Sequence, residues 1–444
     1  MSVSAFDSPL YRDLFTDRET ARLFTDSAEI RAMLLVEGAL ARAQGALGLI
    51  PAEAGAAIHR ASLEVQIDPA ALAGATGENG VPIPGLLTAF RAEIGDPQTA
   101  RYLHWGATSQ DIIDTALALR LRQALSRING EASRLARALA DLAETHAETP
   151  MAGRTYGQHA TPTSFGAVAA SWGRPILSHQ TRLEALRPGL LSVSLSGAAG
   201  TGAAFGPDLP ALRQALADAL DLTCPPGSWH SQRDNIAALA GWLTGLTGSC
   251  GKIGEDLILL TQTDIAEVTL GRTGTSSTMP QKQNPVGASV LVALARHNIA
   301  LNGAMQSALL HRQDRDGAAW FTEWLSLPPM IMGAAKAVAL AADLAETLQP
   351  NLARMAANMA GNLDLIHAEM LSQALSTVMT IPESKNKIKV LCEEAKVTQT
   401  ALTTLVARDF PGLDLAETLN PGTLLGHAPA EARAFADTVR KRQG

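Results

Sequence analysis

Aromatic and charged residues are both scarce in this sequence of 444 residues. Phe, Trp and Tyr together make up 4% and Asp, Glu, Lys and Arg 18%, whereas apolar residues make up 46%. Strands favour aromatic and β-branched side chains, whereas closely packed helices favour Ala and Leu. The shortage of aromatic residues therefore predicts an all-α protein, with enough chain for about three domains.

Cysteine and clustered positive charge are also nearly absent. The three cysteines, Cys224, Cys250 and Cys392, are far apart and odd in number. They fit neither a disulfide framework nor a zinc site, so we expect a reducing compartment and no bound metal. The net charge is −7, and the one basic run lies at 440–442. Nucleic acid is not an expected partner, because domains that bind it carry basic patches.

Neither a signal peptide nor a membrane span is predicted. Residues 1–7 lack a basic stretch that leads into an apolar run. The apolar stretch 286–310 contains Arg296, His297 and Asn302. Polar and charged side chains of this kind are costly inside a bilayer. We therefore expect a cytoplasmic protein with no membrane contact.

Long apolar helices are predicted at 111–148, 235–270, 286–310 and 327–348. They are about two to three times as long as the average globular helix, and their apolar faces are wider than one stripe. Small residues at 241, 245, 248, 251 and 254 allow neighbouring helices to approach closely. A chain with so few charges has little to cover such helices, so we predict an obligate oligomer.

Glycine and proline divide the chain into three predicted helical domains. The N-terminal domain covers 1–105, with helical periodicity to residue 50, a loop at 74–85 and a helix that restarts near Gly85. The central domain, 106–348, contains the long helices. Beyond Pro350 the predicted helices shorten, which indicates a small C-terminal domain at 349–444.

Two polar segments directly precede predicted helices. The first, 104–111, reads HWGATSQD, and the helix N-terminus that follows it favours anions. Its Thr108 or Ser109 can alternatively serve only as a cap. The second, 153–163, reads GRTYGQHATPT and is predicted to be a loop before a helix that starts near Ser164. A purely structural loop remains the alternative for this segment.

A third polar segment, 271–285, reads GRTGTSSTMPQKQNP and separates two long apolar helices. It is too long for a plain turn, and long ordered loops are usually functional. Its serines, its lysine and its asparagine offer a proton carrier, a cation and an amide donor. With the N-terminus of the next helix, they suit stabilisation of a developing oxyanion. Gly271 and Gly274 are expected to act as hinges for closure of the segment.

This third segment resembles the Ser-Ser-x-Met-Pro-x-Lys-x-Asn signature of the fumarase/aspartase superfamily. The first two segments resemble the other shared regions of that superfamily, in the expected order. The resemblance covers nearly the whole chain and implies an all-α homotetramer around a central bundle of long helices. It also implies active sites formed by loops from three subunits. The implied chemistry is reversible β-elimination from a carboxylate-bearing substrate, with no metal or organic cofactor.

Position 156 departs from most members of the superfamily. Members that eliminate an amine or a hydroxyl generally read Gly-Arg-Thr-His, and the histidine is assigned to protonation of the leaving group. Here the residue is Tyr156. A carboxylate, whose conjugate acid has a pKa of about 4, leaves without a general acid. The departure therefore fits a reaction in which a carboxylate adds to, or leaves from, an alkene carbon.

Further segments, at 39–51 and 314–324, resemble the bacterial 3-carboxy-cis,cis-muconate cycloisomerases. That family resemblance implies closure of a muconate tricarboxylate to 4-carboxymuconolactone, in the protocatechuate branch of β-ketoadipate catabolism. Three alternatives stay open: an adenylosuccinate lyase, a cycloisomerase for a related diacid such as a sulfonated muconate, and a non-catalytic structural protein.

The resemblance assigns the chemistry to three residues of the third segment. Ser276 is expected to carry the proton, and Lys282 and Asn284 to stabilise the carboxylate that gains charge. The expected substrate-binding residues are His104, Thr108, Ser109, Gln158, His159, Ser277, Met279 and Arg315. For Arg315, an ion pair with Asp314 or Asp316 is an equal alternative. The other histidines, His230 among them, are expected to be structural or on the surface.

Overall fold

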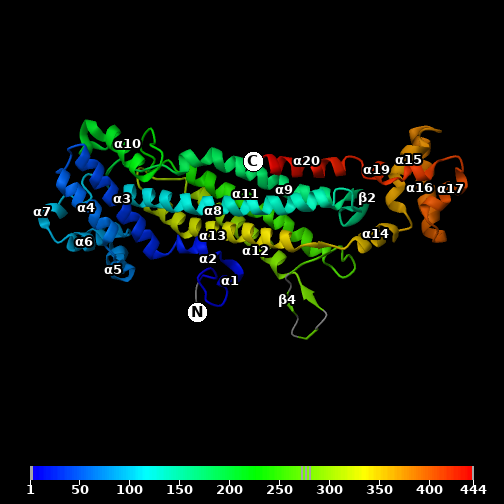
Figure 1. Ribbon diagram of the computed structural model, residues 1–444, viewed down its shortest axis with the longest axis horizontal. Coiled ribbons are helices and arrows are strands. Elements are labelled where there is room, and N and C mark those ends of the chain that lie inside the picture. Colours follow the sequence, from blue (N-terminus) through cyan, green and yellow to red (C-terminus); the bar gives the residue numbers. More distant parts are fainter. Residues whose placement is uncertain (1–3, 272–273, 276–277, 280–281, 443–444) are drawn as a thin grey trace. The chain divides into compact units, whose positions relative to one another are not determined.

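The computed structural model describes residues 4–271, 274–275, 278–279 and 282–442 (Figure 1). Helices dominate these residues, as predicted, and the strands form only two-stranded antiparallel sheets. The long helices are α8 (Ser109–Thr145), α9 (Phe165–Leu190), α11 (Asp234–Leu260), α12 (Val286–Ser307) and α13 (Gly317–Thr347). The strand pairs are β1 (Pro150–Thr155) with β2 (Gln158–Ser164), β3 (Val268–Thr269) with β6 (Gln349–Pro350), and β4 (Gly274–Thr275) with β5 (Gln283–Asn284).

The remaining elements are short or of ordinary length. They are α1 (Arg12–Phe15), α2 (Arg18–Arg22), α3 (Asp26–Ala46), α4 (Ala52–Glu64), α5 (Pro69–Asn79), α6 (Ile83–Ile94), α7 (Pro97–Ala100), α10 (Leu209–Leu220), α14 (Leu352–Ala360), α15 (Ala368–Leu375), α16 (Ile381–Thr398), α17 (Leu402–Asp409), α18 (Leu415–Thr418), α19 (Pro421–Leu424) and α20 (Ala428–Lys441), with 3₁₀ turns η1 (Ala203–Asp208) and η2 (Leu365–His367).

Of two expectations about loops near the N-terminal half, one was too long and the other was wrong. The loop expected at 74–85 is confined to 80–82, because α5 continues to Asn79 and α6 begins at Ile83. Pro84 lies in the first turn of α6, where a missing N–H costs no hydrogen bond. The second polar segment is not a loop, because β1 and β2 form a hairpin there. The predicted start of the next helix is confirmed, since Ser164 Oγ accepts from Ala167 N at 3.1 Å.

The helix predicted at 235–270 is shorter than expected. It ends at Leu260, and the chain then turns through Ala266, which has a positive φ of 49°. Glu267 follows with a fully buried side chain that binds Arg154. This buried carboxylate needs a cation from elsewhere in the chain, and it lies beyond the end of the helix in a stretch where apolar periodicity does not reveal the turn.

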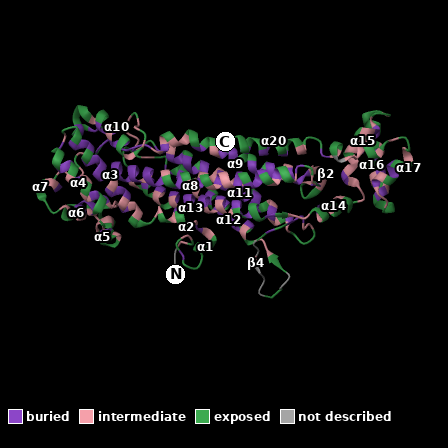
Figure 2. Ribbon diagram, in the orientation of Figure 1, coloured by how far each residue is buried: buried purple, intermediate pink, exposed green. Residues whose placement is uncertain are grey.

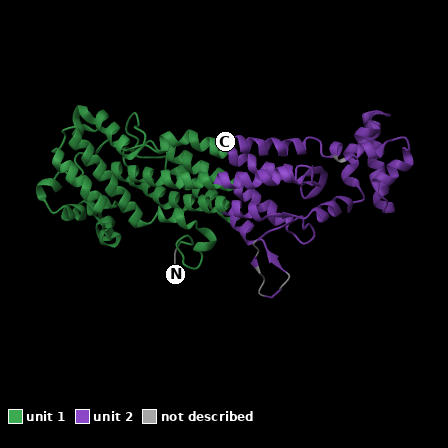
Figure 3. Ribbon diagram, viewed as in Figure 1, with its two compact units in different colours: residues 1–131, 179–248, 293–339 green, residues 132–178, 249–292, 340–444 purple. Residues whose placement is uncertain are grey.

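The chain divides into two compact units (Figure 3). Unit 1 consists of 1–131, 179–248 and 293–339. One apolar cluster of this unit joins α3, α4, α6 and α10 to the first turns of α8. Trp242 Nε1 in α11 donates to the His179 carbonyl in α9 at 2.8 Å. Asn298 Nδ2 in α12 donates to the Met330 carbonyl in α13 at 3.1 Å, so unit 1 contains packed long helices.

Unit 2 consists of 132–178, 249–292 and 340–444. Trp172 Nε1 in α9 donates to Asp256 in α11 at 2.7 Å, and Arg134 in α8 pairs with Asp343 in α13 at 2.7 Å. A separate apolar cluster holds α15, α16 and α17 together. The capping box at Thr380 and Glu383 begins α16. The predicted boundaries at 105 and 348 stay a prediction.

Glycines in α11 allow close packing at some of the expected positions. A Cβ added at Gly245 would lie 2.8 Å from His179 Cε1, and one at Gly254 would lie 2.6 Å from the Ala288 carbonyl oxygen. Neither distance is possible for a real side chain, so these two glycines are needed for helix contact. Gly241 and Gly248 instead have nothing within 4 Å of the added atom among the described residues, so close packing at these two positions stays a prediction.

Helix α13 is long and apolar enough to cross a membrane by length and composition alone. However, 67% of its most apolar window is buried within the protein. Core helices of soluble proteins meet the same criterion. Figure 2 shows buried residues along this helix and its neighbours.

Candidate functional site

Asp111 organises the first polar segment. Its fully buried carboxylate accepts hydrogen bonds from the backbone N–H groups of Ser196 at 2.8 Å, Gly197 at 2.9 Å and Thr108 at 3.0 Å. His230 Nε2 lies 2.8 Å from the same carboxylate, and that imidazole is also fully buried. Several hydrogen bonds are what a buried carboxylate requires. The network fixes the start of α8 against the loop that contains residues 196–197.

Thr108 and Arg315 are brought together, although they are far apart in the sequence. Arg315 Nη1 donates to Thr108 Oγ1 at 2.8 Å. Arg315 itself is exposed and has a positive φ of 58°, which is uncommon for a residue other than glycine. Within the described part of the chain the alternative ion pair with its neighbours is not observed: Asp314 accepts from Ser231, and Asp316 pairs with Arg312. An exposed guanidinium held beside the N-terminus of a long helix suits a carboxylate ligand.

His104 lies next to a buried acid. Its Nδ1 is 2.6 Å from Glu37 Oε1, and the Glu37 side chain is fully buried. Burial of His104 opposes its protonation, but the Glu37 carboxylate outweighs burial, so the pKa of His104 is raised. The cation is therefore favoured, as an anion-binding role requires. Ser109 begins α8 and is partly buried.

A buried ion-pair network supports the same helix and was not predicted. Arg233, 1% exposed in its side chain, donates two hydrogen bonds to Asp114 in α8 and two to Glu323 in α13. Burial opposes the charge of Arg233, but the two carboxylates outweigh it and raise its pKa. Gln110 connects this network to the first one, because its Nε2 donates to both Asp114 and the His230 carbonyl. The partners lie about ninety or more residues apart in sequence, so spacing alone could not reveal them.

The β1–β2 hairpin presents the second set of predicted residues. Tyr156 and Gly157 form its two-residue turn, with φ values of 50° and 71°. Two positive φ angles give the twist that hairpin strands need. The Tyr156 side chain is fully exposed, and Gln158 is exposed next to it. His159 is partly buried opposite Arg154, and both burial and the Arg154 charge lower the pKa of His159.

Arg154 anchors the hairpin. It makes two hydrogen bonds of 2.7 Å to the carboxylate of Glu267. Asn358 Nδ2 donates to the same carboxylate at 2.9 Å. Fork-like pairing of this kind is geometrically specific, so it fixes the base of the hairpin while the tip stays exposed.

The third polar segment is described only in part. The predicted residues Ser276 and Ser277 lie outside the described residues. Lys282 is exposed, Met279 is 44% exposed, and the Lys282 N–H donates to the Met279 carbonyl at 3.0 Å. Asn284 is paired with Gly274 across the β4–β5 ladder, two residues before α12 begins. The structure thus places the predicted lysine and asparagine directly before a helix N-terminus, where negative charge is stabilised.

Gly271 and Gly274 have a packing role whether or not they act as hinges. A Cβ at Gly271 would lie 2.6 Å from Thr347 Cβ, and a Cβ at Gly274 would lie 2.6 Å from Val286 Cγ2. Each glycine therefore lets this segment pass close to a long helix. The hinge motion stays a prediction.

The predicted residues thus form two described sets, each within one unit. Set A lies in unit 1 and comprises His104, Thr108, Ser109 and Arg315, and set B lies in unit 2 and comprises Gln158, His159, Met279, Lys282 and Asn284. Set A is supported by Asp111 and Arg233. Set B projects from the exposed hairpin tip and from the segment before α12.

Comparison with known proteins decides the family. A sequence profile described as "Lyase" matches residues 5–299. The chain belongs to this lyase family, within the fumarase/aspartase superfamily. A 3-carboxy-cis,cis-muconate cycloisomerase from Pseudomonas aeruginosa is 38% identical over 420 residues, which cover 92% of this chain and 91% of the relative.

Two further matches extend the comparison. The crystal structure of a 3-carboxy-cis,cis-muconate lactonizing enzyme from Pseudomonas putida superposes with a TM-score of 0.91 at 34% identity, covering 98% of this chain and all of the other. A nitrosuccinate lyase from Streptomyces davaonensis is 37% identical over 433 residues, which cover 91% of this chain and 89% of the relative. This lyase family therefore includes relatives with more than one named activity at similar identity.

Proposed function

We propose that this protein is a 3-carboxy-cis,cis-muconate cycloisomerase. It closes its substrate to 4-carboxymuconolactone, an intramolecular lyase reaction of protocatechuate catabolism in the cytoplasm. The observation that carries this assignment is the similarity to enzymes of that name over nine-tenths of both chains, in a sequence that keeps Ser276, Lys282 and Asn284.

The ring closes when a carboxylate oxygen of the substrate attacks an alkene carbon of the same molecule. As the new C–O bond forms, the π electrons of the attacked double bond move away from the attacked carbon. They are taken up by a second substrate carboxylate, which is attached at the other end of that double bond. Lys282, Asn284 and the N-terminus of α12 stabilise the charge that collects there. Ser276 then gives its proton to carbon, which completes the lactone. In the reverse direction Ser276 is the base.

Set A provides the groups that hold the other carboxylates. Arg315 and Thr108 are already hydrogen-bonded to each other, and the His104 cation is favoured by Glu37. Their positions are fixed by buried networks rather than by substrate, which lowers the entropic cost of binding. The exposed Tyr156 offers no imidazole to protonate a leaving group, which accords with a carboxylate that needs no such help.

The same proposal includes a homotetramer with active sites shared between subunits. Large apolar side chains remain exposed on the long helices, including Leu259 at 50%, Ile299 at 58% and Leu325 at 79%. Gly241 and Gly248 leave open space beside α11. Light scattering should give four times the chain mass of 46.5 kDa. A monomer or a dimer would contradict the tetramer.

Shared sites can be tested by complementation. Arg315→Ala in set A and Lys282→Ala in set B should each remove most of the activity of a pure tetramer. Coexpression of the two impaired chains should restore a measurable part of the activity. Some active sites of the mixed tetramers then receive an intact set A from one chain and an intact set B from another. No restoration in confirmed mixed tetramers would mean that one chain supplies both sets.

A spectrophotometric assay tests the substrate. The purified protein should remove the ultraviolet absorbance of the conjugated diene of 3-carboxy-cis,cis-muconate, and nuclear magnetic resonance should identify the lactone. Nitrosuccinate is the second substrate to test, because its lyase matches this chain almost as well. Turnover of nitrosuccinate or adenylosuccinate alone would overturn the proposal.

A further inference from the structure

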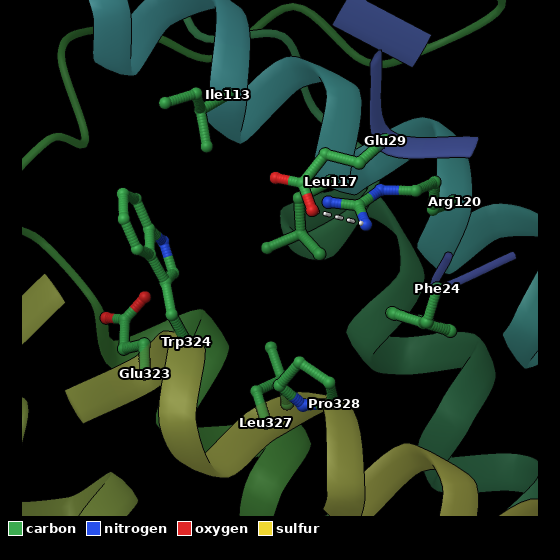
Figure 4. Close-up of a pocket in the computed structure, with 9 residues that line it drawn as sticks. All are labelled: Phe24, Glu29, Ile113, Leu117, Arg120, Glu323, Trp324, Leu327 and Pro328. Carbon is green, nitrogen blue, oxygen red and sulfur yellow. Dashed lines mark hydrogen bonds and ion pairs between the residues drawn. The ribbon is translucent and has the colours of Figure 1, made fainter. Parts of the chain in front are cut away.

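A small cavity lies in unit 1, apart from the residues of set A. Its volume is about 160 Å³, and apolar side chains from α8 and α13 form much of its wall. Figure 4 shows Arg120 and Glu29 on one side, with Trp324 across the cavity from them and Leu327 and Pro328 beneath. A cavity of about 150 Å³ holds one benzene-sized molecule.

Arg120 is a buried cation with too few partners. The residue is 7% exposed, and its Nε has no hydrogen-bond partner among the described residues. Its ion pair is with Glu29, through one Nη1 contact at 3.2 Å. The Glu29 side chain is 36% exposed, so water weakens its hold on the cation. Burial lowers the pKa of Arg120, and the Glu29 carboxylate only partly opposes this effect.

The other walls favour a flat apolar group. Phe24 lies beneath the guanidinium, with Arg120 Cζ 5.6 Å from the ring centroid. Trp324 packs against Trp320 and Phe321 at centroid distances of 4.7 and 5.3 Å, which holds its indole in place. Indole faces contact aromatic rings favourably beyond the area that they bury.

We infer that this cavity is a binding site for a small aromatic monocarboxylate. The carboxylate pairs with Arg120, and the ring contacts Trp324 and Leu117. A second carboxylate is disfavoured, because Glu29 also lines the cavity and would repel it. The occupant is therefore of a different class from the polycarboxylate expected at the active site, and the site does not depend on the proposed reaction.

Isothermal titration calorimetry with benzoate tests the inference on the full chain. We expect saturable binding with a Kd on the order of 1 mM, given the size of the ligand. Arg120→Met should weaken binding by about 10- to 100-fold, since a hydrogen bond to a charged group is lost. Benzamide has the same ring without the charge. It should bind to the unmodified protein about as weakly as benzoate binds to Arg120→Met. Arg137→Met, an exposed arginine of the same helix, is the matched control and should bind normally.

Two further variants keep the test independent of folding defects. Glu29→Gln should bind benzoate more tightly, because the competing carboxylate is gone while Arg120 remains. Leu117→Phe should block binding by filling the cavity without changing any charge. The inference is overturned if benzoate gives no saturable heat at about ten times the expected Kd. It is equally overturned if Glu29→Gln weakens binding or if Leu117→Phe has no effect.

Discussion

The segments before α8 and before α12 look alike in sequence but differ in how the protein holds them. Both are polar, and both lead into the N-terminus of a long helix. The first is fixed by fully buried groups, with Asp111 accepting four hydrogen bonds. In the second, Lys282 and Met279 are exposed, and a two-residue ladder supports the described part.

This difference separates binding from chemistry. A site that positions a carboxylate benefits from groups fixed in advance. A segment that supplies a proton and excludes water must close on the substrate and open again. We therefore expect substitutions in the first segment to affect stability and those in the second to affect turnover. The predictions below test that separation, from the largest expected effect to the smallest.

Asp111→Asn should lower the free energy of unfolding by about 3–5 kcal/mol, because it removes a charge that His230 and three backbone N–H groups require. Denaturant titration followed by circular dichroism measures this change. Asp141→Asn, at an exposed position of α8, is the matched control and should have little effect. A loss below about 1 kcal/mol for Asp111→Asn would contradict a fixed first segment.

Lys282→Met should lower kcat by about 10²- to 10³-fold while leaving the unfolding midpoint unchanged. The physical reason is that an exposed lysine contributes little to stability but stabilises charge in the transition state. Steady-state kinetics and thermal unfolding of one preparation give both quantities. Lys389→Met, which is also exposed, should change neither. If Lys282→Met lowered the unfolding midpoint as well as kcat, the distinction between the two segments would be lost.

His104→Gln should lower stability at low pH and have progressively less effect as the pH rises. The folded-state pKa of His104 is raised, so its pairing with Glu37 stabilises the protein fully below pH about 6.5. That contribution, about 1.5–3 kcal/mol, is lost as the pH rises through the raised pKa. Denaturant titrations of both proteins from pH 5.5 to 9, at steps of about 0.5, measure it. His427→Gln is the control at an exposed position. A difference in unfolding free energy between the unmodified protein and His104→Gln that grows as the pH rises would contradict the prediction.

Tyr156→His should change kcat by less than about threefold, which is under 1 kcal/mol in the barrier. A carboxylate leaving group gains little from an added imidazole, and the exposed hairpin tip can hold either side chain. Rates with 3-carboxy-cis,cis-muconate measure this effect, and Tyr156→Phe controls for loss of the hydroxyl. A large gain in Tyr156→His would mean that the leaving group does need protonation.

Local patterns in the sequence predicted the long helices, because apolar periodicity persists over many turns of α8, α12 and α13. Apolar periodicity failed where a distant partner decides the conformation. Helix α11 ends near a glutamate that Arg154 holds. The hairpin at 150–164 was missed because glycine, proline and threonine there suggest a loop. The two positive φ angles at Tyr156 and Gly157 mark a hairpin turn, but they are known only from the structure, in which the strands are paired.

For the candidate site too, local motifs were predictable from the sequence and distant partners were not. Lys282 and Asn284 lie before a helix N-terminus, as their motif predicts. The supporting residues Asp114 and Arg233 were missed, because each finds its partner about ninety or more residues away. Spacing in a single sequence carries no signal for such pairs.

The most direct test of the account compares Ser276→Ala with Ser277→Ala on 3-carboxy-cis,cis-muconate. If Ser276 carries the proton, its loss should lower kcat by about 10²- to 10⁴-fold with little change in KM. Ser277→Ala should retain most of the activity, since that hydroxyl is expected only to bind substrate. Full turnover in Ser276→Ala would contradict the proposed chemistry of the segment before α12.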